Sequence, residues 1–92
     1  MNLTSEHKLK LTTNELITSY QNKNFDLAIK QALSIIKKYP KHITSIKILG
    51  SVYEQTDRLN EALKANQKVL KINPKDPESF ANLGIIFLKL GK

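Results

Sequence analysis

Apolar residues along this chain recur at the spacing of amphipathic helices. The clearest run comprises Ile46, Leu49, Tyr53, Leu59, Ala62, Leu63, Val69 and Leu70. Steps of three, four and seven residues place such side chains on one face of a helix. The pattern predicts an all-α fold of five helices, at residues 10–22, 24–38, 42–55, 58–71 and 77–90. Residues 1–9 lack a clear period, so we expect them to be frayed or to extend the first helix.

The apolar pattern also repeats along the chain. Residues 34 positions apart match in type, as in Ala28 and Ala62, Ile36 and Leu70, Pro40 and Pro74, Leu49 and Leu83, Gly50 and Gly84, and Tyr53 and Phe87. Such a period is typical of stacked helical hairpins, in which each unit buries the apolar face of its neighbour. We expect a single domain over residues 1–92, with repeat one at 10–42, repeat two at 43–76 and the first helix of repeat three at 77–92.

The first helix departs from the 34-residue period. Leu16 and Tyr20 precede Leu49 and Tyr53 by 33 residues rather than 34. This offset predicts that one residue is missing from the turn at residues 21–24. The first helix pair is therefore expected to pack less regularly than the second.

Polar residues mark the expected helix starts. Asp76 before a proline is a strong signal, because its side chain can accept from free backbone N–H groups and Pro suits the first helical position. Asn24 and Asp57 are expected to cap the second helix of each pair in the same way. Thr12 followed by Glu15 matches a capping box for the first helix.

Composition excludes several kinds of site. The 92 residues include no Cys and only two His. Disulfides, thiolate metal sites and cysteine nucleophiles are thereby ruled out, and we expect no cofactor and no metal. The longest apolar run falls far short of the roughly 20 residues of a membrane span, and no targeting pattern is evident. We therefore expect a cytoplasmic protein that does not engage a membrane.

The chain is basic, with a formal net charge of +7. A ridge of Lys is predicted on the second helices, formed by Lys64, Lys68, Lys71 and Lys75 and, one repeat earlier, by Lys30, Lys37 and Lys41. A solvated outer face explains this ridge better than binding does, because exposed Lys pairs weakly. The aromatic residues are expected in the core, which removes the stacking platforms of single-strand binders. A nucleic-acid-binding module is therefore the least favoured alternative.

Motifs for catalysis are lacking in the sequence. The strongest carboxylate cluster is Glu54, Asp57 and Glu61, and its members fit helix capping and solvated faces better than acid–base chemistry. His42 precedes a helix, where an interhelical contact or a surface position is favoured over a role as a base. We therefore predict that the chain is not an enzyme and has no catalytic residue.

These features together resemble the tetratricopeptide repeat. The features are a period of 34, a Leu-Gly pair followed by an aromatic (Leu49, Gly50 and Tyr53), an Ala in the second helix and a closing Pro such as Pro74. The resemblance covers residues 10–92 and implies an α-solenoid of about two and a half repeats. The array is also similar to the N-terminal repeats of bacterial O-linked N-acetylglucosamine transferase-like proteins, although no transferase residues are present.

The resemblance implies that the first helices line a concave groove for a peptide or helix of a partner protein. On these helices, the positions facing away from the predicted core are Asn14, Thr18, Gln21, Lys47, Ser51, Glu54, Gln55, Asn82, Ile85 and Lys89. They combine donors, acceptors and charges, as a peptide backbone leaving water requires. A non-catalytic protein-interaction module is therefore the favoured function. The alternative is the repeat segment of a larger glycosyltransferase-like or other transferase protein, where it guides substrate or assembly.

The last predicted helix carries apolar residues that a following helix would normally cover. They are Phe80, Leu83, Ile86, Phe87 and Leu90. A terminal repeat normally needs a polar outer face. We expect either that this array continues in a longer protein or that a second copy of the chain covers the strip, which makes these positions candidates for homo-oligomer contacts.

Overall fold

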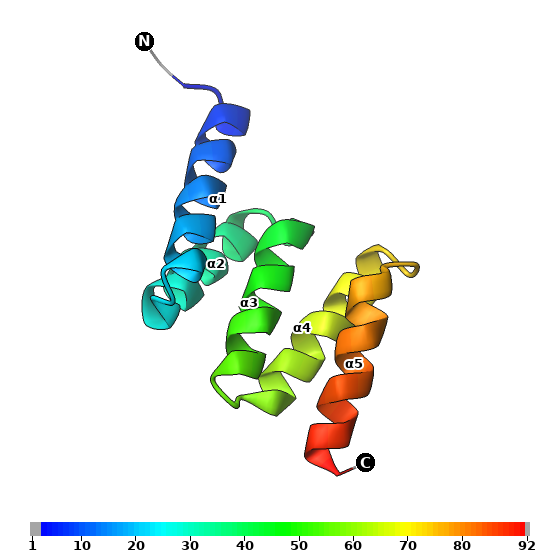
Figure 1. Ribbon diagram of the computed structural model, residues 1–92. Helices are drawn as coiled ribbons and strands as arrows, with labels where there is room; N and C mark the ends of the chain where they lie inside the picture. Colours follow the sequence, from blue (N-terminus) through cyan, green and yellow to red (C-terminus); the bar gives the residue numbers. More distant parts are fainter. Residues whose placement is uncertain (1–2, 92) are drawn as a thin grey trace.

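A computed structural model describes residues 3–91 and contains five α-helices and no strand within that range. The helices are α1 (Ser5–Gln21), α2 (Phe25–Lys38), α3 (Ile43–Gln55), α4 (Leu59–Ile72) and α5 (Pro77–Leu90). They stack in chain order as antiparallel neighbours, and α1 and α5 lie at opposite ends of the stack (Figure 1). The molecule measures 53 × 28 × 18 Å. The predicted all-α solenoid is confirmed.

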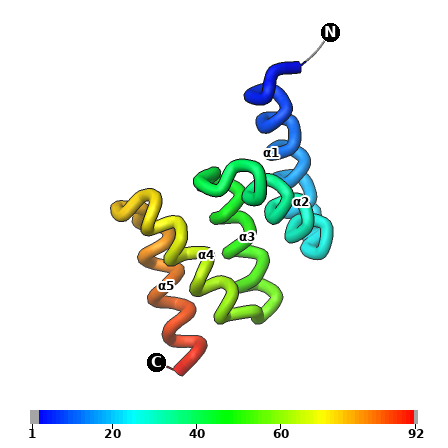
Figure 2. The backbone as a smooth tube through the Cα atoms, turned by 180° about the vertical axis from the view of Figure 1, so that it is seen from behind, coloured from blue at the N-terminus to red at the C-terminus, as the bar shows by residue number. Residues whose placement is uncertain are grey.

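The helices form two layers. In Figure 1, α1, α3 and α5 lie side by side in front of α2 and α4, and Figure 2 shows the same layers from behind. Each rear helix packs between two front helices: α2 contacts α1 and α3, and α4 contacts α3 and α5. We call the surface made by α1, α3 and α5 the odd-helix face.

Helix α1 begins earlier than the predicted start at residue 10. Thr4 is its N-cap, and the Thr4 hydroxyl accepts a hydrogen bond from the His7 backbone N–H at 3.1 Å. Residues 5–9 therefore extend the first helix. The predicted capping box is wrong, because Thr12 lies inside the helix and donates its hydroxyl to the carbonyls of Lys8 and Leu9. A Thr inside a helix satisfies its side chain locally in this way and gives no start signal.

The turns inside the two hairpins have the same backbone. Lys23 and Asp57 adopt left-handed conformations, with φ of 59° and 63°. In both turns, the backbone N–H of the next residue donates to a carbonyl five residues earlier, from Asn24 to Ser19 at 2.9 Å and from Arg58 to Tyr53 at 2.7 Å. This is the Schellman arrangement that satisfies the last carbonyls of a helix. The prediction of a missing residue in the turn at 21–24 is therefore wrong, since the backbone keeps the 34-residue period.

The second helices start without side-chain caps. Asn24 is the N-cap of α2 but makes no capping hydrogen bond, and Arg58 rather than Asp57 is the N-cap of α4. Both predicted caps are wrong, because these short turns are fixed by their left-handed residue and backbone hydrogen bonds.

The front helices α3 and α5 do start with side-chain caps. Asp76 Oδ2 accepts from the Ser79 backbone N–H at 2.9 Å, and Pro77 occupies the first turn, as predicted. His42 takes the equivalent place in α3, where its Nδ1 lies 3.4 Å from the Ser45 backbone nitrogen and 2.8 Å from the Ser45 hydroxyl. Burial lowers the pKa of His42, which favours the neutral ring that this cap requires.

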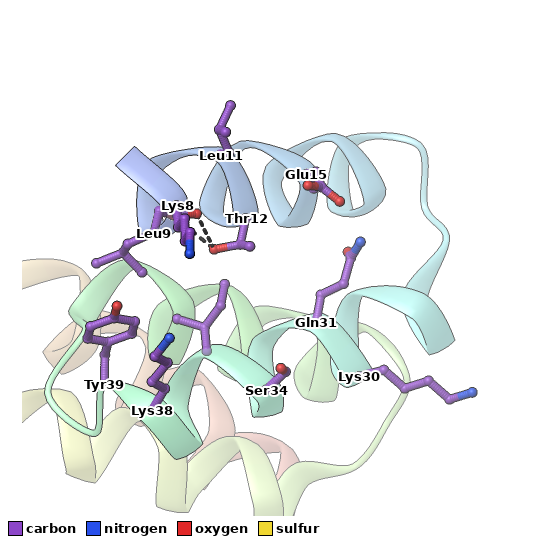
Figure 3. A pocket seen from close by; sticks show the side chains of 11 residues that line it. Lys8, Leu9, Leu11, Thr12, Glu15, Lys30, Gln31, Ser34, Lys38 and Tyr39 are labelled. Atoms are coloured by element: carbon purple, nitrogen blue, oxygen red, sulfur yellow. Dashed lines mark hydrogen bonds between the residues drawn. The ribbon is translucent and has the colours of Figure 1, made fainter. Parts of the chain in front are cut away.

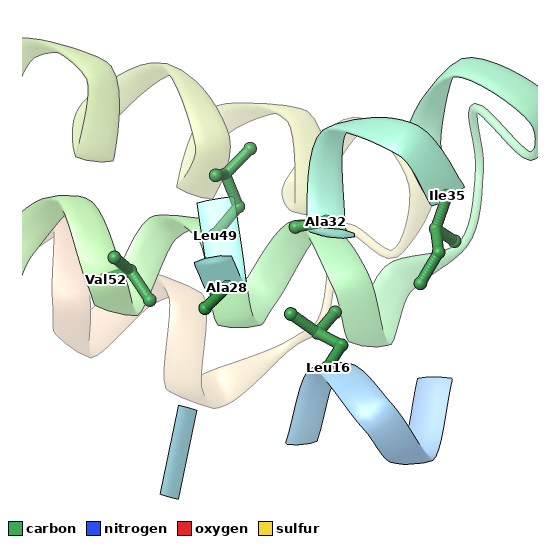
Figure 4. Close-up of a cluster of buried hydrophobic side chains, with 6 residues drawn as sticks. All are labelled: Leu16, Ala28, Ala32, Ile35, Leu49 and Val52. Carbon is green, nitrogen blue, oxygen red and sulfur yellow. The ribbon is translucent and has the colours of Figure 1, made fainter. Parts of the chain in front are cut away.

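The core lies between the two layers. Its larger cluster joins α1, α2 and α3 and comprises Leu16, Ala28, Ala32, Ile35, Leu49 and Val52 (Figure 4). A second cluster of Ile46, Ala65 and Val69 joins α3 to α4. Gly50 allows that second contact to be close, since a Cβ atom built at Gly50 would lie 3.2 Å from the Ala65 Cβ.

The aromatic residues of α5 depart from the predicted core. Phe80 is 58% exposed and Phe87 is 37% exposed, whereas the equivalent Ile46 is buried and Tyr53 packs against the larger cluster. The reason is that α4 covers α3, while no helix follows α5 in the part of the chain that the structure describes. The expectation that Phe80 and Phe87 are core residues is therefore wrong for this chain.

Candidate functional site

A small pocket on the odd-helix face lies between α3 and α5. It has a volume of about 90 Å³, and its lining is Gly50, Ser51, Glu54, Asn66, Asn82, Ile85 and Ile86. Four of the ten predicted partner-binding residues meet here: Ser51, Glu54, Asn82 and Ile85. Small-molecule sites usually measure about 300–1,000 Å³, so this pocket has room for one small side chain rather than a cofactor.

An amide pair forms the floor of this pocket. Asn66 is 5% exposed on α4 and donates its Nδ2 to the Ala62 carbonyl at 2.8 Å. Its Oδ1 in turn accepts from Asn82 Nδ2 at 3.4 Å. The buried Asn66 thus orients the Asn82 amide toward the pocket. Asn66 was not among the predicted site residues, although a polar residue within the apolar stripe of α4 is a usable signal, because buried polar groups need partners.

Three ion pairs connect α3 to the start and the end of α5 near the pocket. At the N-terminal ends of both helices, Lys47 Nζ lies 3.2 Å from Asp76 Oδ1 and 2.6 Å from Glu78 Oε2. At the other end of the pocket, Lys89 of α5 pairs with the lining residue Glu54. Three predicted partner-binding residues, Lys47, Glu54 and Lys89, are therefore paired within the chain, across the two walls of the pocket.

The ion pair at the helix starts is reinforced by hydrogen bonds. The hydrogen bond to Glu78 is the main reason that the pKa of Lys47 is raised. The Ser79 hydroxyl and backbone N–H, followed by Lys47, lower the pKa of Asp76. Both shifts favour the charged forms at neutral pH, so the contact persists there.

A second hydrogen-bonded group connects α1 to α3. The Tyr20 hydroxyl lies 2.6 Å from the Ser51 hydroxyl and accepts from Gln55 Nε2 at 2.8 Å. Gln55 also donates to Ser51 at 3.2 Å. Tyr20 is partly buried, so its ring joins the core while its hydroxyl reaches the odd-helix face. Ser51 thereby links this group to the pocket.

The three predicted residues of α1 lie apart from the pocket. Asn14, Thr18 and Gln21 are exposed, and Thr18 donates its hydroxyl to the Asn14 carbonyl at 3.0 Å. Asn14 lines a separate open hollow with His7 and His42. The structure therefore does not bring the ten predicted residues into one continuous site, and the α3–α5 pocket is the part where they converge.

The predicted self-association residues differ in their exposure to solvent. Phe80 and Phe87 are exposed, Leu83 and Leu90 are partly exposed, and Ile86 is fully buried. The neighbouring Leu88, which the sequence analysis did not include, is 79% exposed. The exposed apolar side chains of α5 therefore include Leu88 and exclude Ile86.

The described residues offer no candidate set of metal ligands and no candidate membrane span. Among residues 3–91 no group of three His, Asp or Glu side chains is placed to hold a metal ion. In the same range no helix is both long enough and apolar enough to cross a membrane. The ridge residues Lys64, Lys68, Lys71 and Lys75 are exposed.

One family model and two curated relatives match parts of the chain. Residues 50–91 match the family model of the TPR repeat. The chain is 32% identical over 66 residues to a UPF0162 protein of Xylella fastidiosa, covering 72% of this chain and 24% of that protein. It is 30% identical over 54 residues to the protein CTR9 homolog of Arabidopsis thaliana, covering 59% of this chain and 5% of that protein.

Solved structures share the fold. Two mutants of MamA superpose with a TM-score of 0.83 at 19% sequence identity. The first match covers 91% of this chain and 61% of that chain, and the second covers 90% and 46%. The chain thus spans less than two thirds of the length of each of these relatives.

Proposed function

We propose that the chain binds a segment of a partner protein on its odd-helix face, at the α3–α5 pocket. The support is that the chain is built of tetratricopeptide repeats, a fold of protein-interaction modules. The observation that carries this proposal is the pocket itself, where the oriented amide of Asn82 and the exposed side chain of Ile85 meet between two ion-paired walls. The proposal concerns binding alone and assigns no reaction to these residues.

The chemistry of the pocket favours an extended, uncharged peptide segment. An amide such as Asn82 has both a donor and an acceptor side, so it can pair with a peptide group that leaves water. Ile85 offers apolar contact for one small side chain of the peptide. The nearby charges of Glu54 and Lys89 already neutralise each other, so the partner is selected by hydrogen bonding and shape rather than by charge.

A selection of peptides on the full chain tests this proposal. Peptides displayed as random 12-residue segments are enriched on the chain, and the dissociation constant of the best one is measured by fluorescence anisotropy. We expect Asn82→Ala or Ile85→Ala to weaken binding about tenfold, the loss of roughly one hydrogen bond or one buried side chain. Lys64→Ala, on the exposed ridge of α4, is the matched control and should leave binding unchanged.

The proposal fails if no enriched peptide depends on Asn82 and Ile85. It also fails if the Lys64→Ala control weakens binding as much as the two pocket variants do. Circular dichroism of each variant shows that the helices remain intact and that the change is local.

The exposed strip of α5 supports a proposal of self-association. Phe80 and Leu88 are among the most exposed large apolar side chains of residues 3–91, and no charged residue separates them on the helix. Contiguous exposed apolar surface is typical of interaction sites. A second copy of the chain is the proposed occupant at high protein concentration.

The length of the relatives supports the alternative function. Because each matched relative is much longer than the matched region, these repeats can serve as one segment of a larger protein, such as a transferase, that guides substrate or assembly. A catalytic sequence in the same reading frame would support this alternative. The peptide-binding test above applies to the repeats in either case.

A further inference from the structure

An open groove of about 570 Å³ runs between α1 and α2 on the side away from α3 (Figure 3). Its α1 wall includes Lys8, Leu9 and Thr12, and its α2 wall includes Gln31, Lys38 and Tyr39. Residues 8, 12 and 15 lie about a third of a turn around α1 from Asn14, Thr18 and Gln21 at 100° per residue. The groove is therefore separate from the odd-helix face.

The first hairpin carries two larger residues where the second hairpin has its close helix contact. In the 34-residue register set by the backbone turns, Leu16 takes the place of Gly50 and Gln31 takes the place of Ala65. In the second hairpin Gly50 and Ala65 let α3 and α4 approach so closely that a single added Cβ would crowd. Leu16 and Gln31 place larger side chains at these positions of α1 and α2, and the groove lies along the outer edge of the two helices.

The floor of the groove is apolar. Leu9 and Tyr39 are partly buried and pack against the larger core cluster, to which Ile35 belongs. Leu11 also borders the groove but points away from α2 in Figure 3. The apolar contact surface for an occupant is therefore formed by Leu9, Ile35 and Tyr39.

The mouth of the groove is positively charged. Lys8 on α1 and Lys38 on α2 project toward each other beside Tyr39 (Figure 3), and Lys30 stands further along the same rim. Glu15 is the single carboxylate in the lining. Two ammonium groups that face each other repel, and a carboxylate placed between them would replace repulsion by attraction.

One polar atom inside the groove lacks a partner. Gln31 Oε1 is shielded from solvent and accepts no hydrogen bond from the residues that the structure describes. A buried carbonyl oxygen without a donor is unfavourable by about 1–3 kcal/mol in general. Gln31 lines the groove, and a donor side chain of an occupant reaches this shielded atom once the Gln31 side chain turns toward the groove.

We propose that this groove binds an acidic amphipathic helix of a partner protein. A carboxylate of that helix lies between Lys8 and Lys38, and a hydrogen-bond donor faces Gln31. Its apolar side chains pack on Leu9, Ile35 and Tyr39. Gln31 and Lys38 are seven residues apart, about two helical turns or 10 Å. The partner helix therefore presents an Asp or Glu, one or two apolar residues, and a Ser, Thr, Asn or Gln along the same distance, as in other grooves that hold helices.

This inference is tested with the full chain and a display library of three-turn helical peptides whose exposed positions are randomised. Selection uses the unaltered chain alone, and the best peptide is then measured against the Lys8→Glu, Lys38→Glu double variant. We expect Asp or Glu to be enriched beside apolar residues, and binding of the best peptide to fall at least about tenfold in the double variant. The peptide's affinity should also decrease as salt is raised, because its charges are exposed at the rim.

The matched control is the Lys64→Glu, Lys68→Glu double variant, which changes the net charge by the same amount on α4. It should leave binding within about twofold, and Asn82→Ala on the odd-helix face should do the same. A Lys8→Gln, Lys38→Gln variant, which removes the charges without reversing them, should give an intermediate loss.

Three results would overturn the inference. One is enrichment of neutral or basic helices as strongly as acidic ones, or no enrichment at all. Another is unchanged binding when Lys8 and Lys38 are reversed. The third is an equal loss in the Lys64, Lys68 control, which would show general attraction to a basic protein rather than recognition by the groove.

Discussion

Two glycines at the same repeat position should respond in opposite ways to one added methyl group. Gly50 and Gly84 are 34 residues apart and both lie inside helices of the front layer. At Gly50 a Cβ atom would lie 3.2 Å from the Ala65 Cβ and 3.4 Å from the Asn66 amide nitrogen. At Gly84 it would meet no atom within 4 Å. We therefore compare Gly50→Ala with Gly84→Ala.

The free energies of unfolding follow from two opposing terms. Replacing Gly by Ala inside a helix stabilises it by about 0.5–1 kcal/mol, through helix propensity and a less flexible unfolded chain. Gly84→Ala should show this gain. At Gly50 the gain is opposed by overpacking of about 1–3 kcal/mol, because the Ala65 Cβ is attached to the α4 backbone and cannot rotate away. Gly50→Ala should therefore be neutral to destabilising, by up to about 2 kcal/mol.

Urea unfolding at micromolar concentration measures the difference. With a slope of about 1–2 kcal/mol per molar urea, Gly84→Ala should raise the midpoint by a few tenths of a molar or more, and Gly50→Ala should not raise it. Helix signal and tyrosine fluorescence should give the same midpoint if unfolding is two-state. The reasoning is refuted if Gly50→Ala stabilises the chain as much as Gly84→Ala does, since α3 and α4 would then not be in close contact.

Two further outcomes test the ends of α5. Asp76→Asn should lower the free energy of unfolding at pH 7. The difference from the unaltered chain should shrink as pH falls through the depressed pKa of Asp76, because the charged form stabilises the fold only above that range. A constant difference from pH 7 to pH 2 would contradict this. At millimolar concentration, light scattering should give a mass above the 10.5 kDa of one chain. Joint Phe80→Asp and Leu88→Asp substitution should restore the monomer, whereas Leu33→Asp on α2 should not, and a strict monomer of the unaltered chain would argue against association.

The repeat could be recognised from sequence because its signals are local and occur more than once. The apolar steps within 42–55 and 58–71 predict helices close to α3 and α4 without knowledge of any contact. Asp76 before Pro77 likewise gave the correct start of α5, since a capping side chain and its target N–H groups are neighbours in sequence. The same reasoning proposed Ser51, Glu54, Asn82 and Ile85 as residues on one face.

Other predictions were wrong where the same short sequence pattern fits two different local structures. Thr12 with Glu15 has the form of a capping box, but Thr4 starts the helix, and a side chain inside a helix can make the same kinds of hydrogen bond. The missing residue at 21–24 was inferred from the match of Leu16 with Leu49. The structure shows that the backbone period is intact and that different side chains occupy the equivalent positions.

The sequence by itself determined the helices, the 34-residue period and the stacking of hairpins, because apolar spacing and turn residues act over a few positions. Only the tertiary structure decided which side chains share a surface. Lys47 is held by Asp76 and Glu78, Phe80 is exposed, and the α1–α2 groove is open. Each of these depends on the distance between helices, which is set by the sizes of facing side chains and by whether another helix follows.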